Sequence, residues 1–389
     1  MIIKASISDL KIGHFVIDIA EQDGSYNLTR AGHIKNNAVI SSLLAKGVTS
    51  VLVDTAKTIG DALTVELPEQ HEKSGPIILE VAKAKKIFSS SKKLQQQIFH
   101  DVLQGRPINT VAIIDTTKHT VDAIFKNPNA LTCVINIRNK NDYLLEHSVS
   151  TSVLMTVFSH FLKMDKDISH QLAIGAFLHD IGKVKIPEKI LNKTGKLTDK
   201  ERSIMQKHVK HSVNILKATP NISALSIEVV AQHHERLDGS GYPLKLKQND
   251  ISNYGAMMAI CDIFDALTAA RPHQASRSHV HAFRLLRKLA HEGKLDLRLV
   301  DLFIKCLGVY PVGTLVELNS QRLAIVEHRN QSDPINPKVR CFYSLKKQRY
   351  VMAEDLDLAK DADFIVRGVK ANEYKLDINR IIEFLLLEG

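Results

Sequence analysis

The feature that most constrains the fold is a run of helical periodicity from about residue 108 to 310. Segments such as VAIIDTTKHTVDAIFKN, SHQLAIGAFLHDIGK and ISNYGAMMAICDIFDALTAAR carry apolar residues at three- and four-residue spacing. This spacing gathers the apolar side chains on one face of a helix. So many successive segments of this kind predict a mainly α chain whose largest part is a helical bundle.

The N-terminal part follows another pattern. Residues 1–75 combine short alternating segments, HFVIDIA and SVLVDT, with a helical stretch that ends near Gly47, which predicts a small α+β domain. Residues 76–106 predict a helical linker with five lysines between Lys83 and Lys93. Such lysines are typical of a solvated helix face, and an arm for nucleic acid or a membrane is the alternative.

Strand patterns return after the bundle, which we place at residues 107–310. GTLVELN, RLAIVEHR and KVRCFYS alternate or cluster β-branched and aromatic residues, which predicts strands. A short helix is expected from Asp377. Residues 311–389 therefore form a small β-rich C-terminal extension in this interpretation.

Composition bounds the class of protein. The chain has 389 residues, of which 44% are hydrophobic, enough for a sizeable core and two or three domains. No apolar run approaches the length of a membrane span, and MIIKASISDLKIG lacks a signal-peptide core, so we expect a cytoplasmic protein. The four scattered cysteines predict buried thiols. The net charge of +10 fits nucleic acid, an anionic membrane or a phosphate-bearing ligand without choosing among them.

Two pairs of neighbouring polar residues interrupt the apolar pattern. His179 and Asp180 end the segment AIGAFLHDIGK, where burial of both groups is costly unless a partner such as a metal ion satisfies them. His233 and His234 form a second pair. Because adjacent residues on a helix diverge by about 100°, we expect neighbouring ligands to serve different metals.

Further imidazoles and carboxylates lie in the same bundle. His147 and His208 add nitrogen donors, Asp262 adds a carboxylate, and Asp265 lies on nearly the same helical face as Asp262. His147 alone would more often be a surface or core residue. A mixed nitrogen and oxygen donor set suits iron or manganese, admits zinc or nickel, and disfavours calcium.

Such a donor set predicts a reaction class. Two metals bridged by a carboxylate and a water supply hydroxide near neutral pH and stabilise charge on phosphoryl oxygens. The residues therefore predict phosphoester hydrolysis.

Three motifs add a resemblance to a known family. HDIGK at 179–183, HHERLDGSGYP at 233–243 and DIFDALTAARP at 262–272 together resemble the HD-GYP family of bacterial cyclic di-GMP phosphodiesterases, a branch of the HD phosphohydrolase superfamily. The resemblance implies an HD-type helical domain with a two- or three-metal site. It also implies hydrolysis of cyclic di-GMP to pGpG and often to GMP.

The resemblance assigns roles to individual residues. Asp180 becomes the bridging carboxylate and, with Lys183 beside the scissile phosphate, a catalytic candidate; a solvated helix-end lysine is the alternative. The implied metal ligands are His147, His179, Asp180, His208, His233, His234 and Asp262. The implied substrate-binding residues are Lys183, Arg271, Asp265, Gly239, Gly241 and Tyr242.

The loop that contains GYP has two further interpretations. Its glycines allow positive φ, so the loop can border the substrate pocket. It can equally be structural, or it can contact a protein partner.

Four positions depart from the family pattern. Members with three metals carry a glutamate four residues before the first ligand histidine, where this chain has Tyr143; we therefore expect two divalent ions, since a phenol is a poor ligand at neutral pH. Ser212 stands where many members have glycine. His273 and Gln274 replace the usual residues of RPYR, which leaves the nucleotide preference open.

Alternative functions remain at this point. A mixed cyclic GMP-AMP is the competing substrate for a phosphodiesterase. A catalytically weak cyclic-dinucleotide receptor that signals through the GYP loop is the second alternative, and a nucleotide hydrolase of the HD superfamily is the third. We expect the flanking domains to be regulatory or to form a homodimer, and we expect neither a membrane nor a nucleic-acid polymer as partner.

Overall fold

A computed structural model describes most of the chain. The described residues are 2–23, 28, 31–54, 58, 76–136, 143–269, 277–330, 333, 335–374, 376 and 381. Internal contacts divide the chain into two compact units. One unit comprises 1–79, 315–325 and 339–389, and the other comprises 80–314 and 326–338. The boundaries of the four predicted segments stay predictions.

The N-terminal part is α+β, as expected. Its sheet has the order β1-β4-β2-β3 and consists of β1 (Ile2–Ser6), β2 (Phe15–Gln22), β3 (Gly32–His33) and β4 (Val48–Asp54). The helix α1 (Asn37–Ala45) begins where the Asn36 side chain accepts a hydrogen bond from the Val39 amide. It ends before Gly47, whose φ of 76° is easy for glycine alone. Both observations confirm the expected helix and its stop.

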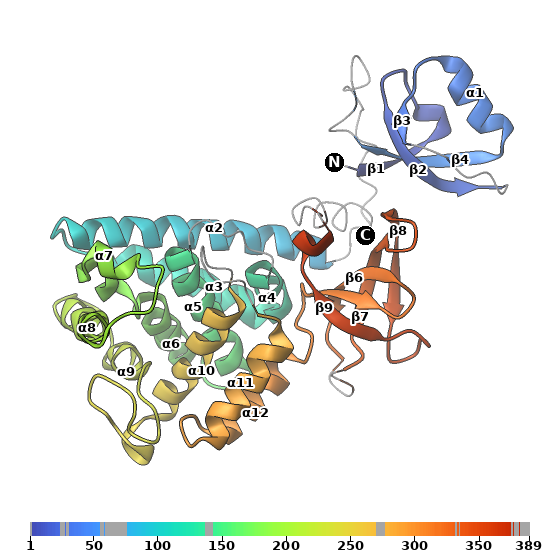
Figure 1. Cartoon of the computed structure of the whole chain (residues 1–389). Helices are drawn as coiled ribbons and strands as arrows, with labels where there is room; N and C mark the ends of the chain where they lie inside the picture. Colours follow the sequence, from blue (N-terminus) through green and yellow to red (C-terminus); the bar gives the residue numbers. More distant parts are fainter. Residues whose placement is uncertain are drawn as a thin grey trace. The chain divides into compact units, whose positions relative to one another are not determined.

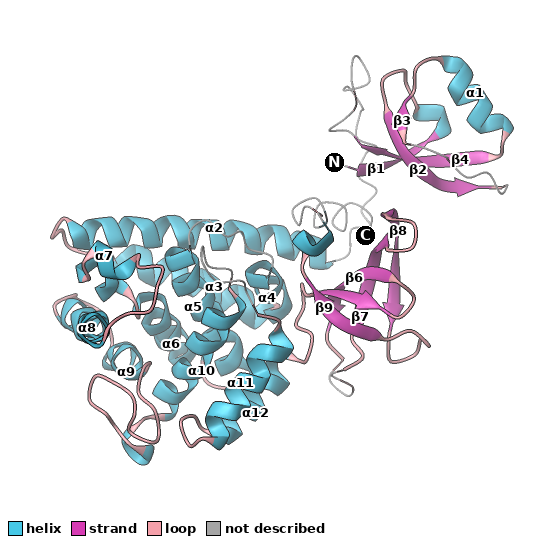
Figure 2. Cartoon of the chain, viewed as in Figure 1, coloured by secondary structure: helices cyan, strands magenta, loops and turns pink. Residues whose placement is uncertain are grey.

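The C-terminal part is a five-stranded sheet (Figure 2) with the order β8-β7-β6-β5-β9. The strands are β5 (Leu315–Leu318), β6 (Arg322–His328), β7 (Lys338–Ser344), β8 (Arg349–Asp357) and β9 (Ile365–Val369). The first three were predicted, and the two edge strands were missed because few of their residues are buried, which leaves little hydrophobic alternation. The predicted helix from Asp377 falls outside the described residues.

The helical unit confirms the predicted bundle (Figure 1). Its helices are α2 (Pro76–Leu103), α3 (Thr110–Lys126), α4 (Pro128–Asn136), α5 (Tyr143–Phe161), α6 (Lys166–Leu178), α7 (Glu188–Leu191), α8 (Asp199–Lys217), α9 (Ala224–Gln232), α10 (Asn253–Thr268), α11 (His279–His291) and α12 (Leu297–Leu307). In the described part of the chain, no helix combines the length and the apolar character needed to span a membrane.

The long helix α2 has one buried seam and one exposed basic face. Phe88 and Ile98 are buried, whereas Lys83, Lys86 and Lys93 are exposed. This arrangement agrees with a solvated helix face. Elsewhere on α2, Lys92 donates a hydrogen bond of 2.9 Å to Glu146 of α5.

The helices that carry the site pack closely because small residues line their contacts. A Cβ on Gly175 of α6 would lie 2.8 Å from the Ser226 carbonyl oxygen of α9, closer than packed atoms allow. On α6 the residues Leu172 and Phe177 are buried, as is Met258 of α10, and each such side chain contributes about 1.5–3 kcal/mol to stability. The four cysteines are free and buried, as expected. The bundle therefore holds the ends of α6, α9 and α10 in fixed positions.

Candidate metal centre

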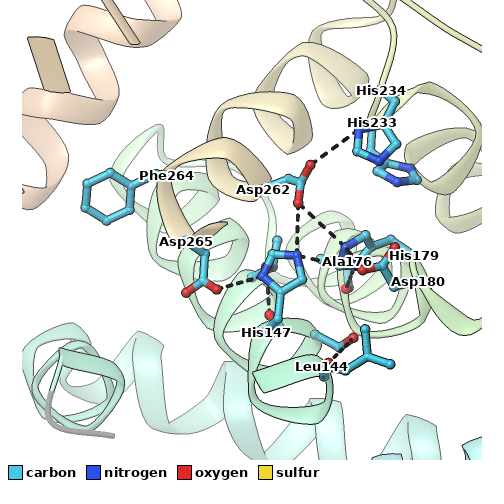
Figure 3. A network of polar contacts seen from close by, with 12 residues as sticks. Leu144, His147, Ala176, His179, Asp180, His233, His234, Asp262, Phe264 and Asp265 are labelled. Atoms are coloured by element: carbon cyan, nitrogen blue, oxygen red, sulfur yellow. Dashed lines mark hydrogen bonds and ion pairs between the residues drawn. The ribbon is translucent and has the colours of Figure 1, made fainter. Parts of the chain in front are cut away.

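The seven predicted ligands meet in one buried cluster inside the helical unit. His147 comes from α5 and Asp262 from α10 (Figure 3). His208 comes from α8. The remaining ligands follow the ends of α6 and α9: they are His179, Asp180, His233 and His234. All seven are buried except His234, which is half-buried. The fold thus confirms that these distant segments converge.

Three of the ligands form what we call the inner triad, His147, His179 and Asp262. Their donor atoms all lie within 4.8 Å of one another. Asp262 Oδ1 lies 3.0 Å from His147 Nε2 and 3.9 Å from His179 Nε2. This spacing suits one metal ion.

Three others form the outer triad, His208, His233 and His234, whose donor atoms also lie within 4.8 Å. The Nε2 atoms of His208 and His233 are 3.4 Å apart. The second oxygen of Asp262, Oδ2, lies 3.6 Å from His234 Nδ1. A second ion would have imidazole ligands on several sides here.

Asp180 lies between the two triads. Its Oδ2 is 3.3 Å from His179 Nε2 of the inner triad. Its Oδ1 is 3.4 Å from His208 Nε2 of the outer triad. Each carboxylate oxygen therefore faces a different triad, which is the arrangement required of a bridging ligand.

Backbone contacts orient the rings of three histidines. The Nδ1 atoms of His179, His208 and His233 donate to the carbonyl oxygens three residues earlier, at 2.8, 2.8 and 2.6 Å. A carbonyl only accepts, so in each neutral ring Nδ1 carries the hydrogen and Nε2 presents its lone pair to the cluster. Ligand histidines in proteins are commonly held by such an outer partner.

Two buried atoms test whether a metal fits. Among the described residues, His179 Nε2 and Asp180 Oδ1 are buried without a hydrogen-bond partner. An unsatisfied buried polar atom costs about 1–3 kcal/mol. Divalent cations bound in this cluster would satisfy both atoms, because each offers a lone pair. The residues therefore fit divalent metal binding.

The charge states of the outer triad agree with this assignment. Burial lowers the pKa of His208 to about 4 and that of His233 to about 3. Burial also lowers the pKa of His234 well below its ordinary value. Neutral imidazole is the form that binds metals, so these rings are ready to act as ligands at pH 7.

The inner triad and Asp180 behave differently. Burial opposes protonation of His147, but hydrogen bonds with Asp262 and Asp265 prevail and raise its pKa to about 9. Burial would raise the pKa of Asp180, yet the nearby His179 and Lys183 side chains hold it well below its usual range. Asp180 thus stays ionised, and a metal at the inner triad has to displace a proton from His147.

One expectation about neighbouring ligands stays a prediction. We expected His179 and Asp180, and likewise His233 and His234, to serve different metals. His233 lies in the outer triad with His234, and their ring centroids are 4.1 Å apart. The donor atoms of His179, Asp180 and His233 also lie within 4.8 Å of one another. His179 and His233 are the C-cap residues of α6 and α9 and keep helical backbone angles.

Lys183 and Asp265 also lie at the centre. Lys183 Nζ is 2.5 Å from Asp180 Oδ2, so this lysine is not a solvated helix-end residue. Asp265 is buried, and its Oδ2 lies 2.7 Å from His147 Nδ1. We predicted Asp265 to bind substrate; its position behind the His147 ring instead favours a role in orienting that ligand.

The GYP loop lies against the outer triad. Gly239 has the expected positive φ, 78°. Gly241 does not, and is needed for another reason: a Cβ there would lie 2.4 Å from the Arg236 amide nitrogen. The Tyr242 ring packs on His234 with a centroid distance of 4.6 Å.

Several predicted positions fall outside the described residues. They are Arg271, His273, Gln274 and the side chain of Tyr143. Their predicted roles in substrate binding, nucleotide preference and metal number stay predictions.

Sequence reasoning missed the importance of Ser212. Its buried hydroxyl donates to the His179 carbonyl oxygen and accepts from the Gly182 amide, both at 2.8 Å. A Cβ on Gly182 would lie 2.1 Å from the His208 carbonyl oxygen, so α8 and the HDIG turn are in close contact. The available signal was spacing, since Ser212 lies four residues after His208 on the same helical face.

Comparisons with known proteins agree with this geometry. The HD domain family matches residues 133–299, and a domain of unknown function (DUF3391) matches residues 2–113. The chain is 28% identical over 379 residues to a cyclic di-GMP phosphodiesterase of Pseudomonas aeruginosa, covering 92% of this chain and 90% of that protein. It is 40% identical over 137 residues to a cyclic di-GMP phosphodiesterase of Thermotoga maritima, covering 35% and 37% of the two chains.

Two more similarities complete the comparison. A 3'3'-cGAMP-specific phosphodiesterase of Vibrio cholerae is 34% identical over 166 residues, covering 43% of this chain and 38% of that protein. The solved structure of an HDG"Y"P protein from Bdellovibrio bacteriovorus shares the fold, with a TM-score of 0.50 and 19% identity over 78% of this chain and 98% of that chain. Residues 133–299 of the chain thus match an HD domain, in which the HDIGK and GYP motifs meet at one buried centre.

Proposed function

We propose that the protein is a metal-dependent phosphodiesterase that hydrolyses cyclic di-GMP to pGpG or GMP. The observation that carries the proposal is the position of Asp180, whose two oxygens face two different triads. The names of the Pseudomonas and Thermotoga relatives support cyclic di-GMP as the substrate.

The inner and outer triads would each hold one divalent ion, with Asp180 between them. Bound in this way, two ions lower the pKa of a shared water and stabilise negative charge on the phosphoryl oxygens. The mixture of imidazole and carboxylate donors favours iron or manganese, and zinc or nickel also accept it. A count of two ions rests on Tyr143 standing where three-metal members have glutamate.

The protein's own groups would bind and orient the phosphodiester. Lys183, beside Asp180, is placed to neutralise charge that develops on the scissile phosphate. The side chain of Tyr242, on the loop over His234, would border the substrate. Arg271 would contact a second phosphate or a guanine through its planar guanidinium group.

A second substrate is favoured by a specific observation. Three Vibrio cholerae relatives are named 3'3'-cGAMP-specific phosphodiesterases, and one of them is 49% identical to this chain over 98 residues. Cyclic GMP-AMP is therefore the alternative substrate. Both dinucleotides present the same phosphodiester to the metal centre, so the choice depends on contacts with the bases.

The test is chromatography of cyclic di-GMP incubated with anaerobically purified protein and iron(II) or manganese(II). Cyclic GMP-AMP is incubated in parallel, and a Lys183→Ala variant serves to separate metal binding from turnover. Metal-dependent formation of pGpG or GMP supports the proposal, and faster turnover of cyclic GMP-AMP favours the alternative. Bound metal without turnover of either dinucleotide would overturn the enzyme assignment and favour a receptor.

Partner binding forms a separate proposal. Leu244, in the GYP loop, is 64% exposed, which is unusual for a large apolar side chain and supports a protein contact at this loop. A homodimer through the flanking domains is the other partner we propose. Light scattering of the purified protein measures whether it is a dimer.

A further inference from the structure

Glu235 is a buried carboxylate at the metal centre that belongs to neither triad. It follows His234 directly, and only 2% of its surface is exposed. Its Oε1 accepts a hydrogen bond from the Leu244 amide at 2.7 Å, and its Oε2 accepts one from the Leu246 amide at 3.0 Å. Both oxygens thus hold the backbone of the GYP loop, and bonds to a charged acceptor are the stronger kind.

The base of the loop is closed without Glu235. Asp238 and Lys247 form an antiparallel bridge, and the Gln248 amide donates to the Leu237 carbonyl oxygen at 3.0 Å. Loss of the Glu235 contacts would therefore leave the ends of the loop in place. It would release the inner part, which contains Tyr242 and Leu244.

That inner part is seated on an outer-triad ligand. The Tyr242 amide donates to the His234 carbonyl oxygen at 3.2 Å, and the two rings pack with centroids 4.6 Å apart. The close approach of Gly241 to Arg236 and Glu235 allows the loop to lie this near. Glu235 therefore anchors the loop, and Tyr242 of that loop packs on the His234 ring.

His234 depends on this support more than the other ligands do. The rings of His179, His208 and His233 are each oriented by a backbone carbonyl. His234 is the half-buried member of the set, and its Nδ1 faces Asp262 across 3.6 Å. Packing of Tyr242 covers its ring.

We propose that Glu235 is a positioning residue for the outer metal site: it holds the GYP loop so that Tyr242 packs on His234 and keeps that imidazole aimed at the ion. The inference rests on the proposed two-metal centre and is independent of which dinucleotide is the substrate. It assigns the loop a function in metal binding, in addition to any contact with substrate or partner.

The test is a cobalt(II) titration of metal-free protein followed by visible absorption, which reports the affinity and geometry of each site without turnover. Glu235→Gln replaces one acceptor oxygen by an amide that points its hydrogens at a backbone N–H. Loss of a residue that supports a metal ligand commonly costs 10–100-fold in metal affinity, so we expect the outer site to lose about tenfold. The inner site should keep its affinity and its spectrum.

Four further variants make the test specific. Asp238→Asn is the matched control, because it neutralises an exposed carboxylate of the same loop whose bonds go to Ser240 and should change neither site. Tyr242→Ala should reproduce the loss, whereas Tyr242→Phe, which keeps the ring, should not. Glu235→Gln combined with Tyr242→Ala should lose no more than either change alone, because both act through one contact.

Each outcome decides a different point. Unchanged cobalt affinity in Glu235→Gln, equal loss at both sites, or additive losses in the double variant would overturn the inference. Wild-type protein that binds two cobalt ions but hydrolyses no dinucleotide overturns the proposed function and leaves this inference standing. Wild-type protein that binds fewer than two ions overturns both.

Discussion

The inner and outer triads differ in what holds their ligands in place. In the inner triad, His147, His179 and Asp262 are buried on helices or at a helix end, and Asp265 of α10 orients His147. In the outer triad, His208 and His233 are similarly held, but His234 is half-buried and covered by a loop. The first site is built by helix packing, and the second is completed by the GYP loop.

This difference shows how one fold can provide two candidate metal sites whose ligands are held in different ways. Helix packing fixes the backbone from which the inner ligands extend, and contacts such as that of Asp265 with His147 orient their rings. A loop needs specific anchors, here the two bonds accepted by Glu235. We therefore expect the two sites to respond differently to mutation, with Asp180 as the shared element.

Asp180→Ala should have the largest effect because it removes the ligand between both triads. We expect both ions to be lost and turnover to fall more than about 100-fold, beyond the 10–100-fold typical of an outer-shell change. Metal analysis of the purified variant and product chromatography measure the two effects. Retention of one tightly bound ion would show that one triad stands without the bridge.

Asp265→Asn should weaken the inner site alone. The substitution removes the charge that faces His147 Nδ1, and we expect a loss of about 10–100-fold in affinity at one site. A two-site cobalt titration separates this site from the outer one. Asp250→Asn, which alters an exposed carboxylate, is the control, and an equal loss at both sites would contradict the division into triads.

Ser212→Ala should act mainly on the stability of the HDIG turn. It removes the hydroxyl that joins the His179 carbonyl to the Gly182 amide, and each buried group left unsatisfied costs about 1–3 kcal/mol. Urea unfolding of the metal-free protein measures this loss. Ser203→Ala on the exposed side of α8 is the matched control and should be nearly neutral.

The smallest effect we predict is a pH dependence of the metal-free protein. The pKa values of His208 and His233 are lowered to about 4 and about 3. Below a pH of about 6.5 these side chains therefore bind protons in the unfolded chain but not in the folded one. Stability should fall as the pH drops from about 6.5 toward 4. The raised pKa of His147, about 9, acts in the opposite sense and contributes stability that is lost as the pH rises through 9.

Unfolding midpoints measured between pH 4 and 10 check this prediction. His208→Asn should flatten the acid side of the profile, since it removes one of the three imidazoles with a lowered pKa. An unchanged acid side in that variant would contradict the assignment.

Much of the fold followed from hydrophobic spacing. The helices α2, α3, α6 and α10 coincide with predicted segments, and Gly47 ends α1 as expected. The edge strands β8 and β9 escaped prediction because strands with few buried residues show weak alternation. The helix predicted from Asp377 lies outside the described residues.

The amino-acid sequence by itself determined which side chains were candidates for the metal centre and in what order they occur. Polar residues such as His179 and Asp262 within apolar helices indicated a metal, because burial without a partner is too costly. Only tertiary structure decided how the candidates pair. His147 and Asp262 are separated by 115 positions and yet lie 3.0 Å apart, while the donor atoms of His233 lie near those of both His234 and His179.

The same limit applies to two carboxylates of the centre. The residue type of Asp265 and Glu235 permits many functions. Asp265 contacts the ring of a ligand, and Glu235 contacts the backbone of a loop. Sequence spacing states which face of a helix a residue occupies, but the direction in which the next element approaches is set by packing of the whole bundle. Function at this centre depends on those directions, and they exist only in the folded chain.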